Sequence, residues 1–494
     1  MRTRRRGCIW LLRKRGARRK EEQDNNKHKQ PVLILFYIYM QFSLQEYKEW
    51  FSNNENNIKE MFSDFLTFPS ISTDLAYREH CLKTATWLEE TLRKTGMTVE
   101  QMPSSGLPVV FGEHIPTMAA HSLLIYNHYD VQPVDPLEEW ATPPFESTWR
   151  DEVVYARGAS DNKGQCLITI IALWALLCLE PDLPLRIKFF IEGEEESGSK
   201  GTLEVLEREA KRFQADYLCV LDFDMASLGH PALVLGYRGL IAMEIECKTA
   251  ETDLHSGVYG GIAINPLQVL SHALSACTDS QGHVVIPGFY EGMTELSQEE
   301  ERRVDFSVDV HAYKQEHGLL AIYQEEELVK RGWIYPTFEI NGLIGGYTGD
   351  GFKTVIPAKA RAKVSCRLVP GQDPHKVQEK VEAFLQTKMP QGVVLSIKPL
   401  KGAPSLRVNT ESALLSIVLR CLEETFGVPC CYTFCGGSVP VVSTLAAVVK
   451  GDVALFGFAL STDNIHAPNE HMHWSSIKQG FLAMTRLLWQ IAHS

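Results

Sequence analysis

Residues 185–199, LRIKFFIEGEEESGS, join an apolar run to four glutamates within five positions. The run at 185–191 is short and rich in isoleucine and phenylalanine, which is typical of a buried strand. Carboxylates crowded together repel one another, and they are unfavourable away from water unless a positive group lies among them. The stretch therefore predicts a buried strand that delivers acidic side chains to a cation.

Strands and helices alternate on both sides of this stretch. Strands alternating with helices imply a largely parallel sheet covered on both faces, and sites in such sheets form beyond the carboxyl ends of the strands. We therefore expect an α/β protein. The expected strands are 122–130, 185–193, 215–222 and 453–459, and the helices between the first three are 163–179 and 199–213.

The pattern changes near residue 238. Polar and apolar residues then alternate as in half-buried strands, at 240–250, 335–342 and 360–371, with helices at 265–277 and 374–389. This is typical of an open α+β sheet. We expect a smaller α+β domain at 238–402, inserted into a catalytic domain built from 43–237 and 403–494, after a basic and disordered extension at 1–42.

The charge is unevenly distributed. The net charge is −12, but the first twenty residues hold ten Lys or Arg and no acid, so the remainder carries 39 − 61 = −22. An acidic body argues against a nucleic-acid partner. The apolar run at 31–42 is too short to span a bilayer as a helix, and no small-residue cleavage site follows it. No membrane association is expected, and the alternatives for this segment are a basic targeting arm, an uncleaved anchor or a start codon assigned too far upstream.

The twelve cysteines include no C-x-x-C pair. Several lie inside apolar patterns, which favours reduced core residues and a cytoplasmic location. The cluster at 430–435 admits a redox-active role, although the core interpretation is favoured there too. The cysteines in apolar patterns are Cys166, Cys178, Cys219, Cys247 and Cys366, and those in the cluster are Cys430, Cys431 and Cys435.

Several other polar residues follow the ends of expected strands or lie in loops. Each alone has an ordinary interpretation as a helix cap or turn residue. Together they gather imidazole and carboxylate groups without a thiolate, which suits zinc, with manganese or cobalt as alternatives, and a bridging carboxylate holds two such ions close together. The candidates are His128, Asp130, Asp161, Glu195, Glu196, Asp222 or Asp224, and His466.

Eight motifs extend this pattern over about residues 45–490. In their order they resemble the di-metal amidohydrolase family of aminoacylase, acetylornithine deacetylase, succinyl-diaminopimelate desuccinylase and glutamate carboxypeptidase. The chain is most similar to the carnosinase and cytosolic non-specific dipeptidase branch. The motifs are NHYDVQPVD, GASDNKGQ, EGEEESGS, DLHSGVYGG, KTVIPAKA, CRLVPG, GGSVPV and HAPNE.

The resemblance implies a zinc-peptidase catalytic domain interrupted by a lid and dimerisation domain, with two divalent metal ions per chain. It implies that Asp161 bridges the ions, that Asp130 positions a metal-binding imidazole, and that Glu195 is the general base for a metal-bridging water. The implied ligands are His128 and Asp222 for one ion and Glu196 and His466 for the other, with Asp222 preferred to Asp224 for its spacing to the following proline.

The resemblance also implies a homodimer. In related enzymes the histidine that corresponds to His255 reaches the active site of the partner subunit and stabilises the oxyanion. Arg367 is implied to bind the substrate carboxylate. Thr354, Ser438 and Gly437 are the other implied substrate contacts. The expected substrate is a dipeptide or small peptide; the alternatives are an N-acyl amino acid deacylase and, more remotely, a non-catalytic peptide-binding dimer.

Two short segments depart from the dipeptidase pattern. Phe434-Cys435 stands where relatives have Arg-Glu, and Asn341 stands where a histidine is common. Both changes concern the substrate rather than the metals. Of the remaining glutamates in the opening stretch, we expect Glu194 to be a solvated charge, while Glu192 is unassigned, with a supporting role behind the ligands as one interpretation.

Overall fold

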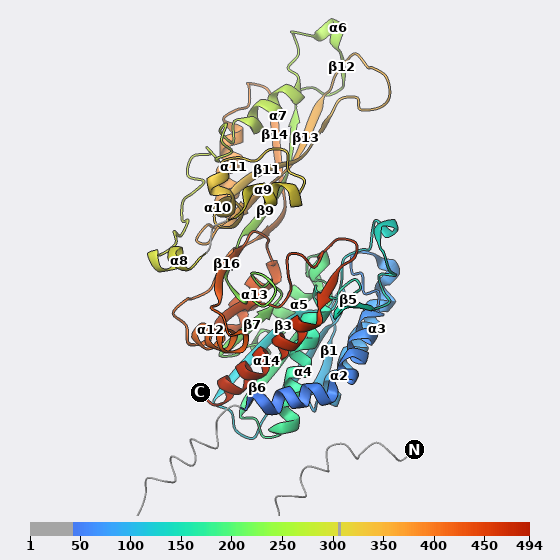
Figure 1. Ribbon diagram of the computed structural model, residues 1–494. Helices are drawn as coiled ribbons and strands as arrows, with labels where there is room; N and C mark the ends of the chain where they lie inside the picture. The colour runs from blue at the N-terminus through green and yellow to red at the C-terminus, as the bar shows by residue number, and fades with distance from the viewer. Residues whose placement is uncertain (1–42, 305–307) are drawn as a thin grey trace, which may run out of the picture.

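The computed structural model describes residues 43–304 and 308–494. The predictions made for the basic extension at 1–42 therefore lie outside the described residues. Figure 1 shows two lobes, a broad one built on the central sheet and a narrower one that projects from it. None of the described helices is long and apolar enough to cross a membrane.

A nine-stranded sheet forms the core of the broad lobe, in the order β1-β2-β6-β3-β7-β17-β8-β15 with β16 paired to β8. Its central strands β6, β3, β7 and β17 are mutually parallel, which confirms the expected α/β class. The strands are β1 (Thr98–Met102), β2 (Val109–His114), β3 (His121–His128), β6 (Leu185–Glu192), β7 (Tyr217–Leu221), β8 (Ala232–Tyr237), β15 (Leu406–Arg407), β16 (Cys431–Cys435) and β17 (Asp452–Phe456).

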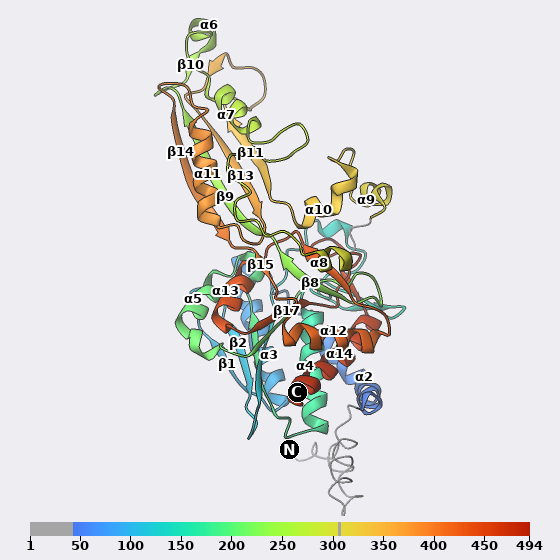
Figure 2. The same cartoon turned by 90° about the vertical axis from the view of Figure 1, so that its left-hand side faces the viewer.

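Helices cover both faces of this sheet (Figure 2). Helix α4 is apolar on all sides and packs between the sheet and helices α2 and α14, so it is buried nearly throughout its length. Helices α5 and α13 pack together on the opposite face. The helices of this lobe are α2 (Leu44–Leu66), α3 (Arg78–Lys94), α4 (Lys163–Leu179), α5 (Lys200–Glu209), α12 (Ala413–Phe426), α13 (Pro440–Val449) and α14 (Trp474–Ala492).

The narrower lobe is an antiparallel sheet in the order β11-β13-β9-β14 with helices α7 and α11 on one face. Buried and half-buried residues alternate along β9, because only one face packs against those helices. Its apolar side chains form a hydrophobic cluster separate from the main core. The elements are β9 (Gly239–Lys248), α7 (Pro266–Ser275), β11 (Thr337–Gly345), β13 (Lys359–Leu368), α11 (Pro374–Gln386) and β14 (Val394–Ala403).

Short elements complete the described chain. A two-stranded ribbon and a four-residue helix lie at the far tip of the narrow lobe (Figure 1), and a small three-stranded sheet lies beside the central one. These elements are β10 (Leu254–His255), α6 (Ser256–Tyr259), β12 (Val355–Ile356), α8 (Gln298–Arg303), α9 (Val310–Glu316), α10 (Leu328–Trp333), β4 (Thr148–Arg150), β5 (Val153–Tyr155) and β18 (His471–His473).

The observed elements correct some expectations. Strands β1, β2, β8 and β16 lie outside the predicted strands, and each has only five or six residues. Two separate cores agree with an inserted domain, and the domain boundaries themselves stay a prediction. Cys178 is exposed near the end of α4 rather than in the core, since the buried positions of this helix end at Leu176.

Candidate metal centre

The carboxyl ends of three neighbouring parallel strands meet at one edge of the central sheet. β3 ends at His128, β6 is followed by a single 3-10 turn at Glu195–Ser197, and Asp222 comes directly after β7. Because the strands are adjacent and parallel, their following residues are brought to the same edge. The side chains singled out in the sequence therefore converge.

One group consists of His128, Asp161 and Asp222. The Nε2 atom of His128 lies 3.0 Å from Asp161 Oδ1 and 3.3 Å from Asp222 Oδ1. Burial works against protonation of His128, but Asp222 and the other carboxylates raise its pKa well above the ordinary value. The imidazole is thus held among anionic oxygens at a buried position.

A second group consists of Asp161, Glu196 and His466. The Nε2 atom of His466 lies 2.9 Å from Asp161 Oδ2 and 3.3 Å from Glu196 Oε1. The hydrogen bond to Asp161 raises the pKa of His466 to about 10, while burial raises the pKa of Glu196 to about 7. Asp161 thus presents one oxygen to each group.

The donor set fits two divalent ions. Each group offers one imidazole nitrogen and two carboxylates, and no cysteine belongs to either. Among the described residues no regular hydrogen bond reaches the buried Oε1 atom of Glu196, whose neighbour at 3.3 Å is His466 Nε2. An anionic oxygen in such a position is unfavourable unless a cation is nearby. Two divalent ions that share Asp161 would neutralise the negative charge of these crowded carboxylates.

Asp130 holds these ligands in place. Its carboxylate accepts the backbone N–H groups of Glu195 at 3.2 Å and Glu196 at 3.0 Å, and the hydroxyl of Ser72 at 2.6 Å. Its Oδ1 also lies 3.3 Å from His128 Nδ1. A proton held on Nδ1 by this contact leaves the Nε2 lone pair free to bind a metal.

Asp222 and Asp224 differ in position. Asn162 donates to Asp222 Oδ1 at 2.6 Å and orients that carboxylate toward His128. Asp224 belongs to neither group, although it lines the same cavity, and burial raises its pKa to about 7. The geometry favours Asp222, and its assignment as a ligand stays a prediction.

A cavity of about 640 Å³ opens beside the two groups. Glu195 lies on its wall, and burial raises the pKa of this carboxyl well above the ordinary value. Residues of β16 and the last residue of α10 also line this cavity. Among the lining residues are Asp161, Asp222, His466, Trp333, Tyr432, Phe434 and Cys435.

Three of the expected substrate contacts lie together. Arg367, on β13, donates from Nη1 to Ser438 Oγ at 2.7 Å, and Gly437 precedes Ser438. The hydroxyl of Ser438 in turn donates to the carbonyl of Arg238. The loop between β16 and α13 is thereby joined to the base of the narrow lobe.

The other two expected contacts lie elsewhere. His255 and Thr354 are exposed on the tip of the narrow lobe, where Ser256 N–H donates to the Thr354 carbonyl at 3.1 Å. Figure 1 places α6 and β12 at the end of this lobe farthest from the central sheet. A single chain therefore does not bring His255 to the metal groups.

Glu470 was overlooked in the sequence although it belongs to the motif HAPNE. It is fully buried and accepts the backbone N–H groups of Gly158, Ser160 and Asp161 at 2.8–3.0 Å, as well as Arg157 at 2.7 Å. It thereby shapes the loop that carries the shared aspartate. A charged residue inside a matched motif was the available signal.

The two remaining glutamates of the opening stretch are both engaged. Glu194 is not a solvated charge, because its carboxylate lies against the backbone of Gly106 and Gly201. If either glycine carried a side chain, its Cβ atom would lie only 1.9 Å (Gly106) or 2.4 Å (Gly201) from a carboxylate oxygen of Glu194. Glu192 is fully buried and accepts the hydroxyl of Tyr126 at 2.8 Å. It therefore contacts the core behind the site rather than a ligand.

The clustered cysteines show no sign of activation. Burial raises the pKa of Cys430 and of Cys435, which keeps both as neutral thiols. Cys430 also donates to the Cys431 carbonyl at 3.6 Å. The core interpretation therefore suits this cluster better than a redox role.

The family model described as peptidase family M20/M25/M40 matches residues 124–490. The chain belongs to this family. The peptidase is therefore a hydrolase of peptide bonds, as its resemblance to the di-metal amidohydrolases implied. The matched segment includes His128, Asp161 and His466.

Relatives of the peptidase are known across nearly its whole length. It is 30% identical over 431 residues to a human protein named Beta-Ala-His dipeptidase, covering 81% of this chain and 83% of the relative. It is 27% identical to a protein of Schizosaccharomyces pombe named Cys-Gly metallodipeptidase, and the match covers 92% of this chain and 99% of the relative. The solved structure of an M20 family metallo-carboxypeptidase from Sulfolobus solfataricus is 32% identical, with a TM-score of 0.79 over 88% of this chain and 99% of that one.

Proposed function

We propose that this peptidase is a di-metal dipeptidase that hydrolyses the amide bond of dipeptides or other small peptides. The observation that carries the proposal is the carboxylate of Asp161, which is shared between two groups that each contain an imidazole and a second carboxylate. The names of the dipeptidase relatives support the choice of substrate.

One ion would be held by His128, Asp161 and Asp222, and the other by Asp161, Glu196 and His466. Nitrogen and oxygen donors without thiolate favour zinc, with manganese or cobalt as substitutes. When bound, the ions lower the pKa of water and polarise the carbonyl of the substrate.

Glu195 would act as the general base. It lies on the cavity wall beside Asp161 and Asp222 but belongs to neither metal group. Burial raises its pKa, so it is suited to accept a proton from the attacking water and then to donate it to the leaving amine. Its backbone is fixed by Asp130, which limits the positions that the carboxylate can take.

Arg367 would bind the carboxylate of the substrate. Its guanidinium is half-buried and already donates to Ser438, so its orientation is restricted before substrate enters. Phe434 and Cys435 stand where relatives have a charged pair, and with Trp333 they give the cavity an apolar wall. This wall favours dipeptides with uncharged side chains.

A homodimer would complete the site. His255 lies at the tip of the narrow lobe, and apolar side chains are exposed around it, including Val258 at 60% and Ile262 at 78%. The tip thus offers apolar surface for contact with a second copy, whose active site would receive His255. Buried thiols such as Cys166 and Cys219 are consistent with a reducing compartment, and we propose a cytoplasmic location.

A substrate panel tests the proposal. The purified chain is loaded with zinc, manganese or cobalt and given dipeptides, N-acetyl amino acids and N-succinyl amino acids, with Glu195→Gln as the inactive control. We expect metal-dependent hydrolysis of dipeptides. Hydrolysis of the acyl amino acids alone would favour the deacylase alternative, and peptide binding without turnover would favour a non-catalytic dimer.

A further inference from the structure

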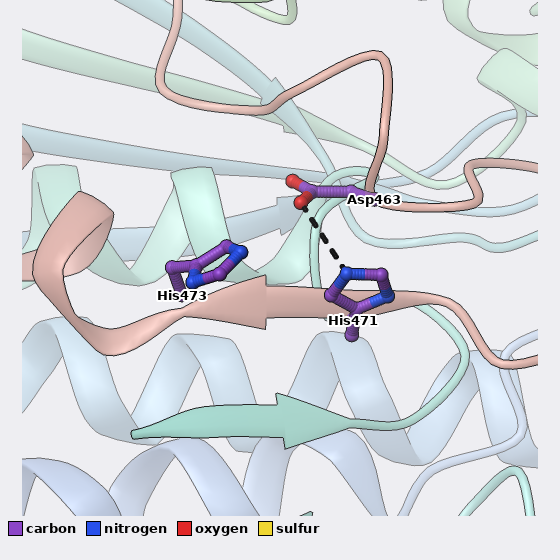
Figure 3. A group of neighbouring side chains, drawn as sticks. All are labelled: Asp463, His471 and His473. Carbon is purple, nitrogen blue, oxygen red and sulfur yellow. Dashed lines mark ion pairs between the residues drawn. The ribbon is translucent and has the colours of Figure 1, made fainter. Parts of the chain in front are cut away.

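A third cluster of metal-binding side chains lies outside the two groups that share Asp161. It consists of Asp463, in the loop between β17 and β18, and of His471 and His473, both on β18. Residues two apart on a strand point to the same face. Figure 3 shows both imidazoles on the side of β18 that faces Asp463.

The carboxylate of Asp463 is held in place through only one of its oxygens. Oδ2 accepts the hydroxyl of Ser160 at 2.7 Å and the backbone N–H of Leu460 at 2.9 Å. Asp463 is 0% exposed, and its Oδ1 atom is buried without a hydrogen-bond partner among the residues that the structure describes. An anionic oxygen left unpaired in the interior is unfavourable, so its position points to a missing cation.

The histidines have the geometry of metal ligands. His471 Nδ1 lies 3.0 Å from the Asn469 carbonyl, so Nδ1 carries the proton and Nε2 presents its lone pair. That Nε2 atom lies 4.0 Å from Asp463 Oδ1, which is too long for a hydrogen bond. One ligand atom from each of Asp463, His471 and His473 lies within 4.8 Å of the others.

A simple ion pair between Asp463 and a protonated His471 is the plainer explanation. It leaves His473 without a role in the cluster, and it places the charges farther apart than a direct hydrogen bond would. A zinc ion with bonds of about 2.0–2.2 Å would draw all three ligand atoms inward and satisfy the unpaired oxygen.

We propose that Asp463, His471 and His473 form a third metal site, which takes a zinc ion with water in the fourth position. The site joins β18 to the loop that carries His466. Its role is structural: the ion fixes this loop by both of its ends, since the backbone N–H of His471 also donates to the Asp463 carbonyl at 3.0 Å.

The test counts zinc ions in the full-length chain. Metal is removed by dialysis against a chelator, zinc is restored, unbound zinc is removed, and bound zinc is measured by mass spectrometry. His473→Gln is compared with His272→Gln, an exposed histidine on α7, and each is made in the natural chain and in an Asp161→Asn background. We expect His473→Gln to remove about one zinc ion per chain in both backgrounds and the control to remove none.

Each outcome separates this site from the catalytic one. Unchanged zinc content in His473→Gln would overturn the third site and leave the dipeptidase proposal intact. Unchanged content in Asp161→Asn would instead contradict the di-metal centre. If circular dichroism shows that His473→Gln does not fold, the zinc content of the Asp161→Asn chain decides, measured with and without His471→Gln added to it. Bound zinc that is lost when His471→Gln is added supports the third site. An Asp161→Asn chain without bound zinc, or one that keeps its zinc when His471→Gln is added, overturns it.

Discussion

His466 Nε2 lies 2.9 Å from Asp161 Oδ2, although the two residues are 305 positions apart in the chain. The contact joins a loop after β17 to the loop before α4. His466 has a positive φ of 62°, which is uncommon for a residue with a side chain and is typical of functional sites. Two loops that are distant in the sequence are therefore brought together where the second metal group forms.

The adjacent acids Glu195 and Glu196 should respond differently to the same change. Glu195→Gln removes the proposed base, so we expect turnover to fall about 10²–10⁴-fold with both metals retained. Glu196→Gln removes a ligand, so we expect metal loss together with loss of activity. Metal content and dipeptide hydrolysis are measured on both variants, and equal metal loss in the two would contradict the division of roles.

Asp130 should control metal affinity without binding metal itself. In Asp130→Ala the N–H groups of Glu195 and Glu196 and the Nδ1 of His128 lose their acceptor, so we expect zinc affinity to fall about 10–100-fold. Competition with a chromophoric chelator measures this. Ser72→Ala, which removes only one donor to Asp130, is the control and should have a much smaller effect.

Arg367→Ala should raise KM for dipeptides far more than it lowers kcat, because it removes the group proposed to bind the substrate carboxylate. The effect should shrink for dipeptide amides, which lack that carboxylate. Arg361 lies on the same strand but is exposed and paired with Glu246, so Arg361→Ala serves as the control. An equal loss on acids and amides would show that Arg367 has another role.

His255 should act on the neighbouring subunit. His255→Ala and Glu195→Gln are each expected to be inactive, but a mixed population formed by refolding or subunit exchange should regain about a quarter of the natural activity, because one site of each mixed dimer is intact. No recovery, despite exchange shown by mass spectrometry, would place His255 in its own subunit's chemistry or outside catalysis.

Glu192 should make the fold less stable at high pH. Burial raises its pKa to about 7 from an ordinary value of 4.5, so its contribution to stability is full below pH 4.5 and is lost as the pH rises to about 7. Glu192→Gln keeps an acceptor for Tyr126 without a charge. We expect it to raise the free energy of unfolding by about 1–3 kcal/mol at pH 8 and by little near pH 4.5.

Denaturant unfolding at several pH values measures this difference. Glu90→Gln, at an exposed position on α3, is the control and should change stability little at any pH. A difference for Glu192→Gln that is the same at pH 4.5 and pH 8 would show that the buried carboxyl does not titrate in this range.

Much of this molecule was determined by short-range patterns in its sequence. The apolar run before Glu192 and the alternation after residue 238 predict the parallel sheet and the antiparallel lobe, because burial on two faces or one leaves a different periodicity. Helix α4 begins and ends at the predicted residues 163 and 179. The polar residues at strand ends, together with the resemblance, indicated the candidate metal ligands.

Tertiary structure decided what depends on distant contacts. Strands such as β1 and β16 are defined by their pairing with neighbours, and their sequences are too short to signal it. Glu194 is enclosed because Gly106, which is distant in the chain, leaves room for its carboxylate together with the nearby Gly201. The Oδ1 atom of Asp463 is buried and unpaired because its loop packs against β18. Burial and hydrogen bonding of this kind depend on which segments fold together, and the local sequence does not show that.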